Sequence, residues 1–435
     1  MKIFSQTKAS SSDTERKYKR TRFLYIIEAA LEYFFSLLLT GAYIAKVAST
    51  IGMSDATVGI VAQMSSLGCV FQLCALFISG KKSCKRFVLI GHTINQLFFS
   101  SVWLIPLFNL PKDLKIPLFI VALLGGWIIH HIINAPKISW YMSTVDDCKR
   151  GSFTAKKEMF SLVSGMAFTL IMSYIIDTLE AEGNLKGAFL VGGITMLGIT
   201  LLHSLTLLFS HEPSKNENAD NETENIINSI VSLLKNKALK QMLVLSALAG
   251  VVNSCAMPFF GTYQNNELGF SLLFISVIGI IHVIVRCVAS IFMGLYADRR
   301  SFLSMLNISY LFGLLSYLIM AFTVPSNGKL MYTLFYTVFF AIFQAGYGNG
   351  IMNLVFDTVN PYHRTGAWAL HNIVCGVVGF FTTIICSSVL NAIQQSGNKV
   401  FGIALYAQQF LSVITALFII FIIIYINVFL KKKKN

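Results

Sequence analysis

Charged residues are scarce in this chain. Asp, Glu, Lys and Arg make up 12% of its 435 residues, which is about half the share found in soluble globular domains. Hydrophobic residues make up 55%, and apolar segments of ~20 residues, each long enough to cross a bilayer, recur along the chain. The composition therefore excludes a soluble globular protein and predicts an integral membrane protein.

Sequence motifs of enzymes are also missing. The chain has no Walker A loop, no H-E-x-x-H motif and no G-x-S-x-G motif, which hold a phosphate, a zinc ion and a nucleophilic serine respectively. The predicted loops are too short to contain a separate catalytic domain. We therefore expect no enzymatic activity and no cofactor.

Cysteine is absent from the loops that we assign to the outer side of the membrane. The eight cysteines all fall in predicted spans or cytoplasmic loops: Cys69, Cys74, Cys84, Cys148, Cys255, Cys287, Cys375 and Cys386. A disulfide framework is therefore not expected. No cysteine pair has metal-ligand spacing with a companion histidine pair, so we expect no metal site either.

Twelve apolar segments are candidates for membrane-spanning helices, because a helix satisfies its backbone polar groups within one segment. They are residues 22–47, 55–79, 87–108, 115–138, 158–178, 187–209, 238–261, 270–295, 302–324, 329–355, 365–390 and 400–430. The predicted fold is an all-α integral membrane protein with twelve transmembrane helices in two pseudo-symmetric six-helix bundles. The bundles cover residues 1–210 and 238–435, and a central cytoplasmic loop with an interfacial helix joins them over 211–237.

The net charge of +14 is unevenly distributed. The tails and alternate loops on one side of the membrane hold 27 Lys and Arg residues, and the loops on the other side hold six. By the positive-inside rule, we expect a multi-pass protein of the plasma (inner) membrane with both termini in the cytoplasm. The basic excess is then a topology signal. The expected partners are the lipid bilayer, a small-molecule substrate and protons, and not nucleic acid.

An internal repeat relates the two halves. The same offset of 214 residues connects several pairs: Gly80 and Gly294, Lys85 and Arg299, Arg150 and Arg364, Gly165 and Gly379. One offset kept over some 85 residues is hard to obtain by chance. Two parallel six-helix halves, related by an axis along the membrane normal, are an architecture of transporters.

The loop sequences resemble those of a known family. "GLYADRRSF" (294–302), between spans eight and nine, resembles the signature loop of the major facilitator superfamily. "GKKSCKR" (80–86) resembles the first copy of that loop, with Cys84 at the Asp position. "KRGSFTAKKEMFSLVSG" (149–165) resembles the Arg-Gly entry to the fifth helix of bacterial members. The resemblance implies a secondary transporter that works by alternating access.

The resemblance also implies a conformational role for the two signature loops. The residues concerned are Gly80, Arg86, Gly294, Asp298, Arg299 and Arg300. We expect the glycines to let two helices approach, and Asp298 to pair with Arg299 or Arg300 or to cap a neighbouring helix. Cys84 at the Asp position predicts a weaker or differently built latch in the first half. The alternative is that residues 81–86 are only a topogenic charge run.

In this family the first helix of each three-helix unit lines the central cavity, which implies spans one, four, seven and ten here. Span one carries two carboxylates, although each costs ~2.5–3.5 kcal/mol at a helix centre on insertion scales. At 100° per residue, one sector about 120° wide holds its polar residues: Tyr25, Glu28, Glu32, Ser36, Thr40 and Tyr43. The stripe predicts a helix face toward a cavity or a polar helix. For Glu28, the alternative is interfacial snorkelling or a structural ion pair.

Span four places His130, Asn134 and Lys137 on one helix face, at a depth comparable with that of the two glutamates. A carboxylate of span one that faces Lys137 or His130 would lower the desolvation cost of both groups and form a titratable pair. Glu32 is the deeper of the two glutamates, so we expect it to carry the coupling proton. The alternative for Lys137 is a positive-inside anchor.

Spans seven and ten are polar without being charged. Asn253 of span seven, with Tyr336, Gln344 and Tyr347 of span ten, is expected to form a wall that binds a small polar solute. The alternative is helix–helix hydrogen bonding near the glycines of span ten.

Span eight carries His282 and Arg286 on one face, at positions i and i+4. An arginine within a span needs a partner. Asp177 or a substrate carboxylate would supply it, and a structural role for Arg286 is the alternative.

The sequence therefore predicts a secondary active transporter of a small solute, coupled to protons as a symporter, with a sugar-like solute favoured by the neutral walls. A drug or cation exporter of the same fold is an alternative. Residues 158–177 argue against it, because they contain one glycine and no proline where exporters often carry a Gly-Pro-rich signature. A non-transporting membrane sensor is a further alternative that only a flux measurement separates.

Overall fold

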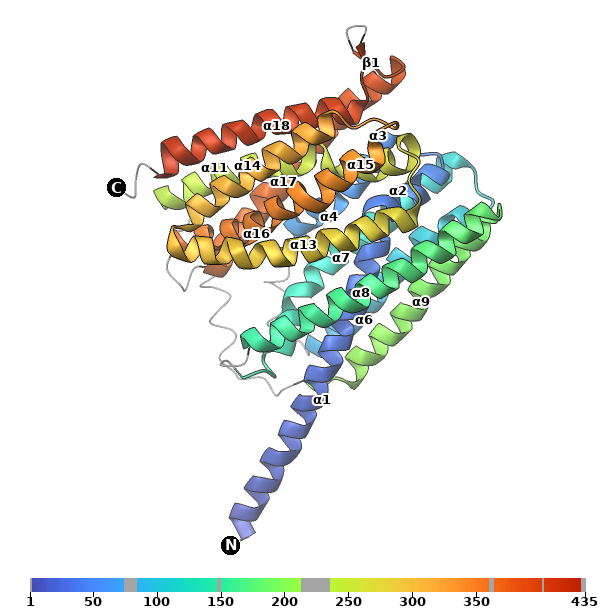
Figure 1. Ribbon diagram of the computed structural model, residues 1–435. Helices are drawn as coiled ribbons and strands as arrows, with labels where there is room; N and C mark the ends of the chain where they lie inside the picture. Colours follow the sequence, from blue (N-terminus) through green and yellow to red (C-terminus); the bar gives the residue numbers. More distant parts are fainter. Residues whose placement is uncertain are drawn as a thin grey trace. The chain divides into compact units, whose positions relative to one another are not determined.

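The computed structural model of the chain is almost wholly helical (Figure 1). It describes residues 2–73, 84–146, 150–212, 235–359, 364–400 and 403–431. Within these residues, ten helices are long and apolar enough to cross a membrane, and the bent pair Glu15–Leu38 and Gly41–Thr50 makes an eleventh. Asp55–Phe71 is a shorter apolar helix at the place of the second predicted span. The rest of that predicted span lies outside the described residues.

Residue contacts divide the chain into two compact units. Unit 1 comprises Met1–Tyr43 and Phe71–Thr223, and unit 2 comprises Ile44–Val70 and Glu224–Asn435. The structure thus groups Ile44–Val70 with the second half of the chain, whereas the sequence assigned it to the first bundle. The predicted division at the central loop stays a prediction, because residues 213–234 of that loop lie outside the described part of the chain.

Unit 1 contains five long helices that pack alongside one another (Figure 1). They are α1 (Lys2–Leu38), α6 (Cys84–Leu104), α7 (Lys112–Met142), α8 (Arg150–Ala181) and α9 (Leu185–Phe209), and the short turn η2 (Ile105–Leu107) follows α6. α1 packs against α8 and α9, and α6 packs against α7 and α9. The polar residues of four of these helices thereby meet inside the unit.

Unit 2 contains the end of the bent first span, helical pieces of the second and seventh spans, and the helices of the last five spans. The end of the first span is α2 (Gly41–Thr50), whose residues from Ile44 onward belong to this unit. The pieces of the second and seventh spans are α3 (Asp55–Ala62), α4 (Met64–Gly68), η1 (Cys69–Leu73), α11 (Lys237–Cys255), η5 (Met257–Phe259), α12 (Phe260–Thr262) and η6 (Tyr263–Glu267). The later elements are α13 (Leu272–Arg299), α14 (Phe302–Ala321), α15 (Gly328–Thr333), η7 (Leu334–Phe339), α16 (Phe340–Asp357), α17 (Arg364–Gln395), α18 (Ala407–Tyr425) and η9 (Ile426–Leu430). A two-residue antiparallel hairpin, β1 (Lys399–Val400) and β2 (Ile403–Ala404), precedes α18. α17 packs against α11, α3 and α4.

Side-chain caps define where several helices begin. A Ser or Asn side chain accepts hydrogen bonds from N–H groups of the first turn, which the helix itself leaves unpaired. These caps are Ser54 of α3, Asn184 of α9, Asn236 of α11, Ser271 of α13 and Ser301 of α14. Hydropathy alone places these helix starts only to within a few residues.

The first predicted span is bent rather than straight. α1 ends at Leu38, and α2 begins at Gly41 after a bend of 48°. The Thr40 hydroxyl donates to the Ser36 carbonyl at 2.7 Å. Gly41 has a φ of +57°, which residues with a side chain rarely adopt. Because the helical register is broken here, the expectation of one polar stripe that reaches Tyr43 is wrong.

The internal repeat is visible in the helix bounds. α8 and α17 each have 32 residues, and both of their ends keep the 214-residue offset. A Cβ at Gly165 of α8 would lie 2.4 Å from the ring of Tyr33 on α1. A Cβ at Gly379, the equivalent residue of α17, would lie 2.4 Å from Ser254 Oγ on α11. In each half, the glycine at the equivalent position of the repeat therefore allows the fifth helix to lie close to the first.

Each unit has a buried apolar core and an apolar outer surface. Tyr25 and Trp140 belong to the core of unit 1, and Tyr317 and Phe335 belong to the larger core of unit 2. Many large apolar side chains point outward, among them Phe292, which is 67% exposed. Such a surface is expected of helices that face lipid.

Candidate functional site

A buried lysine joins two carboxylates in unit 1. Lys137 of α7 has its Nζ atom 2.8 Å from Glu28 Oε1 and 2.5 Å from Glu32 Oε2, both on α1. The side chains of Lys137 and Glu28 are 1% and 0% exposed, whereas that of Glu32 is 27% exposed. Positions i and i+4 share one face of a helix, so both glutamates of α1 can reach the same lysine. We call these three residues the charge cluster.

The other residues predicted on span four lie beside the charge cluster. His130 Nδ1 is 3.5 Å from Glu32 Oε1. The structure therefore contains the pairing between spans one and four that helical spacing predicts. Asn134 is half-buried, and its side chain forms no hydrogen bond with a described residue.

The last two predicted residues of span one have other surroundings. Ser36 is half-buried, one turn beyond Glu32 on α1. Tyr43 lies beyond the bend, and its hydroxyl donates to the Thr169 carbonyl of α8 at 3.0 Å. Both residues belong to unit 1.

Histidines of two other helices complete the surroundings of Glu28. The Gln96 amide of α6 pairs with His203 Nδ1 of α9, so Nε2 carries the proton and donates to Glu28 Oε1, 2.8 Å away. The ring of His92 on α6 lies 4.7 Å from the ring of His203, and its nitrogens have no hydrogen-bond partner among the described residues. Sequence analysis missed these three residues. The available signal was a polar side chain inside an apolar span, which calls for a partner on another helix.

With neutral histidines, the charge cluster carries one negative charge in excess, because two carboxylates face one ammonium group. Glu28 Oε2 and Glu32 Oε1 are buried atoms without a hydrogen-bond partner in the described part of the chain. A net charge away from water is costly, and an unpaired buried oxygen adds to that cost. The cluster can therefore bind one proton or one further cation, and Glu32 is its most accessible member.

One set of residues in unit 1 has the composition of a metal site. Glu28, His92 and His203 each offer a ligand atom within 4.8 Å of the others, and zinc accepts a carboxylate with two imidazoles. However, Lys137 Nζ lies 2.8 Å from the same Glu28 carboxylate, and its positive charge opposes a divalent cation there. We therefore interpret Glu28 and His203 as part of a hydrogen-bonded network around Lys137, with His92 packed against the ring of His203.

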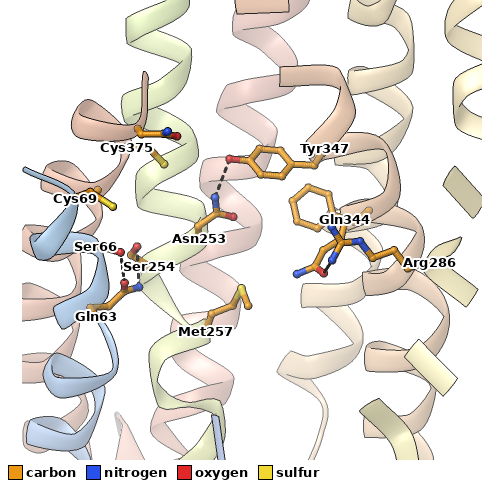
Figure 2. Close-up of a pocket in the computed structure, with 14 residues that line it drawn as sticks. Gln63, Ser66, Cys69, Asn253, Ser254, Met257, Arg286, Gln344, Tyr347 and Cys375 are labelled. Atoms are coloured by element: carbon orange, nitrogen blue, oxygen red, sulfur yellow. Dashed lines mark hydrogen bonds between the residues drawn. The ribbon is translucent and has the colours of Figure 1, made fainter. Parts of the chain in front are cut away.

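A cavity of about 460 Å³ lies in unit 2 (Figure 2). This volume is in the range of small-molecule sites, roughly 300–1,000 Å³. Its uncharged polar wall is made mainly by six residues: Gln63, Asn253, Ser254, Gln344, Tyr347 and Asn372. Arg286 is the only charged residue among the 14 described residues that line it.

Figure 2 shows how the polar side chains border the cavity. The Asn253 amide donates to the Tyr347 hydroxyl at 2.9 Å. Gln63 Nε2 donates to Ser254 Oγ at 3.0 Å, and the Ser66 hydroxyl donates to Gln63 Oε1 at 2.8 Å. Asn253 and Tyr347 were expected in this wall. Gln63 and Ser66 of the second span were not, because only the packing of α3 and α4 on α17 brings them here.

Tyr336, a further residue of the predicted wall, is not among the residues that line the cavity. Its ring stacks on His282 with a centroid distance of 4.5 Å, and its carbonyl oxygen lies 2.5 Å from His282 Nδ1. Tyr336 belongs to the π-helical segment η7, which adds a residue to the turn. Tyr336 therefore contacts His282 rather than the cavity.

The residues of the second signature loop form no latch in the described structure. Asp298, Arg299 and Arg300 are exposed at the end of α13 and form no ion pair with a described residue. The expected pairing of Asp298 with either arginine is therefore not seen. A Cβ at Gly294 would meet nothing within 4 Å, so the expected close approach of helices at this glycine is also not seen.

The last residues of the first signature loop form hydrogen bonds with the end of α9 and the residues that follow it. Gly80 lies outside the described residues, and Arg86 is exposed in the first turn of α6. Lys85 Nζ donates to two carbonyl groups at the end of α9, at 2.7 and 2.8 Å. The backbone N–H of Cys84 donates to Glu212 Oε1 at 2.7 Å. Glu212 thus places a carboxylate at the start of α6, where a negative charge is favoured. Cys84, which stands at the Asp position of the signature loop, supplies no carboxylate of its own.

The apolar helices, the repeated halves and the polar cavity define a multi-pass membrane protein of the transporter class. The chain belongs to the Major Facilitator Superfamily, because the model of that family matches residues 24–383. No curated protein sequence matches the chain.

Solved structures show the same fold at low sequence identity. A mutant of the nucleoside transporter NupG superposes with a TM-score of 0.72 at 15% identity, over 94% of this chain and 98% of that one. An auto-inhibited POT family peptide transporter gives 0.70 at 13% identity, over 96% and 97%. A D-xylose–proton symporter gives 0.67 at 12% identity, over 92% and 96%. The predicted superfamily and all-α transporter fold are confirmed, and the protein is a transporter rather than an enzyme.

Proposed function

We propose that this protein is a proton-coupled secondary transporter of a small polar solute, a symporter of the plasma membrane with both termini in the cytoplasm. Glu32 takes up the coupling proton. The observation that carries the proposal is the charge cluster, in which one lysine is shared by two carboxylates inside apolar helices. The fold shared with a D-xylose–proton symporter supports it.

Protonation of Glu32 would change the contacts of Lys137. While both carboxylates are charged, Lys137 Nζ bonds to each of them. A proton on Glu32 makes that carboxyl neutral, so the charges of the cluster balance and Lys137 pairs with Glu28 alone. The proton thereby changes how strongly α1 is held to α7. Alternating access needs a ligand that interacts differently with two conformations, and this change meets that requirement.

A cationic solute, as an exporter of the same fold would carry, could bind to Glu28 and Glu32 only if these carboxylates had no cation of their own. In the structure Lys137 contacts both carboxylates, so a cationic solute would have to displace it. The amides and hydroxyls of the cavity in unit 2 instead support a solute with several hydrogen-bonding groups.

Uptake into proteoliposomes tests the coupling. We would first identify a solute that stabilises the purified protein in a thermal-shift screen of metabolites, and then follow its labelled form. An imposed inward proton gradient should accelerate uptake by the wild type. E32Q should reduce uptake to the rate without a gradient, because a glutamine cannot take up the proton. E32D should retain part of the gradient dependence.

Glu182 provides the matched control, because it is an exposed glutamate of the loop between α8 and α9. E182Q should keep the gradient dependence of the wild type. Wild-type uptake that ignores the proton gradient, together with undiminished uptake by E32Q, would show that Glu32 does not couple protons to transport.

A further inference from the structure

A positive charge lies at the midpoint of α13. Arg286 is near the centre of Leu272–Arg299, a helix long and apolar enough to cross a membrane. A guanidinium group at such a depth is costly unless it faces water or an anion. Arg286 is exposed and borders the cavity of unit 2, next to Gln344 (Figure 2). The cavity is therefore the environment that must stabilise this charge.

Arg286 has no anionic partner among the described residues. Its Nη1 atom donates to Gln344 Oε1 at 3.2 Å, and this oxygen belongs to a neutral amide. None of the 14 residues that line the cavity is acidic. The wall thus carries one positive charge that no described side chain compensates.

Arg286 and His282 both lie next to the side-chain amide of Gln344, but Arg286 needs an acceptor there and His282 needs a donor. Nδ1 of His282 faces the carbonyl oxygen of Tyr336 at 2.5 Å, and a carbonyl only accepts, so Nδ1 carries the proton. In a neutral imidazole, Nε2 must then accept. The group next to Nε2 is the Gln344 amide, 3.2 Å away, whose NH₂ group can donate after an amide flip. In that orientation Arg286 loses its acceptor, and in either orientation it lacks an anion.

The other residues of the cavity wall suit a ligand with a planar, polar body. Phe343 and Tyr347 of α16 border the cavity, and aromatic rings pack well against other planar groups. Asn253 and Asn372 add amide donors and acceptors. A volume of about 460 Å³ admits a small molecule and no large peptide or lipid.

We infer that this cavity binds a small organic monocarboxylate with a planar, polar body. The carboxylate forms two parallel hydrogen bonds with the guanidinium fork of Arg286, and the planar body packs beside Phe343 and Tyr347. One carboxylate balances one guanidinium, whereas a phosphate monoester carries about −1.5 to −2 and would leave negative charge uncompensated. This inference names the solute class of the proposed transporter and rests on that proposed function. It replaces the sugar-like solute expected from the sequence.

Two pairs of probes test the charge requirement. Nicotinate and nicotinamide have the same planar ring, as do benzoate and benzamide, and within each pair only the first is an anion. Their binding to the purified full-length protein can be measured by calorimetry and by thermal shift. We expect nicotinate and benzoate to bind and their amides to bind at least tenfold more weakly. Phenyl phosphate should bind more weakly than benzoate.

Variants at Arg286 test the binding partner. R286Q should weaken nicotinate binding roughly 10–100-fold, the range of a hydrogen bond to a charged group. R286K should lose less, because lysine keeps the charge without the fork. K240Q is the matched control, since Lys240 is an exposed cation on α11 of the same unit, and it should bind as the wild type does. Melting temperatures without probe will show that each variant is folded.

The inference is wrong if the amides bind as tightly as the carboxylates, if neither carboxylate binds, or if folded R286Q keeps wild-type affinity. Tighter binding of phenyl phosphate than of benzoate would overturn the choice of a carboxylate. These measurements need no proton gradient, so their failure leaves the coupling proposal intact. Conversely, a protein that binds nicotinate as expected but takes it up independently of the proton gradient would refute the coupling proposal alone.

Discussion

Replacement of Lys137 by glutamine removes the only positive charge of the charge cluster. Two carboxylates, Glu28 and Glu32, then face each other without a cation. Glu28 also loses the donor that lies 2.8 Å from its Oε1 atom, and His203 remains as its hydrogen-bond partner. K137Q is therefore expected to destabilise the folded protein strongly.

The size of the effect depends on how far each carboxylate can reach water. Removal of one member of a buried ion pair costs about 3–5 kcal/mol, because an uncompensated buried charge remains. Glu28 is fully buried and should bear most of this cost, whereas Glu32 is 27% exposed and can be partly hydrated. We therefore expect K137Q to lower the free energy of unfolding by about 3–5 kcal/mol at neutral pH.

A double-mutant cycle in detergent isolates the interaction. The free energy of unfolding is measured for the wild type, K137Q, E28Q and the double variant E28Q/K137Q. The double variant should recover part of the loss of K137Q, because the remaining carboxylate, Glu32, is the exposed one. The loss in K137Q should also shrink at lower pH, because protonation removes the unpaired charges.

Three results would refute this reasoning. K137Q could unfold within about 1 kcal/mol of the wild type, below the range for a broken buried pair. The losses of K137Q and E28Q could add up in the double variant, which would mean that Glu28 and Lys137 are not coupled. The loss could be independent of pH. K240Q is the control, and as an exposed substitution it should stay within about 0.5 kcal/mol of the wild type.

Two further predictions concern the packing of the helices. G379A should lower stability by about 1–3 kcal/mol, because a Cβ there would lie 2.4 Å from Ser254 Oγ. G198A, where a Cβ would meet nothing within 4 Å, should be neutral or stabilising, and equal melting temperatures of the two variants would contradict the packing argument. K85M should lower the melting temperature, because two carbonyl groups at the end of α9 lose a charged donor. Each hydrogen bond to a charged group contributes about 1.5–3 kcal/mol, and water that binds the freed carbonyl groups reduces the loss. Hydrogen exchange at the end of α9 should rise in K85M, and unchanged exchange there would argue against this role.

Local patterns along the chain were sufficient for the membrane helices, the repeat and one face of the site. A helix repeats every 3.6 residues, so Glu28 and Glu32 had to share a face, as had His130 and Lys137. A buried carboxylate needs a cation, and this requirement made Lys137 the expected partner. The offset of 214 residues between α8 and α17 is likewise a spacing along the chain, so the sequence was sufficient to predict it.

Only the tertiary structure decided which helices supply the rest of each site. His203 and Gln96 lie on separate helices, and no spacing along the chain relates them to Glu28. The cavity combines Gln63 with residues of α4, η1, α11, η5, α13, α16 and α17, and Arg286 became part of it only when those elements packed together. Tyr43 lies beyond a bend that breaks the helical register, and Tyr336 lies in a π-helical segment outside the cavity lining. The sequence by itself therefore determined which polar groups had to find partners within the membrane. The packing of the helices chose the partners, because desolvation demands that a buried charge be paired but does not say by which residue.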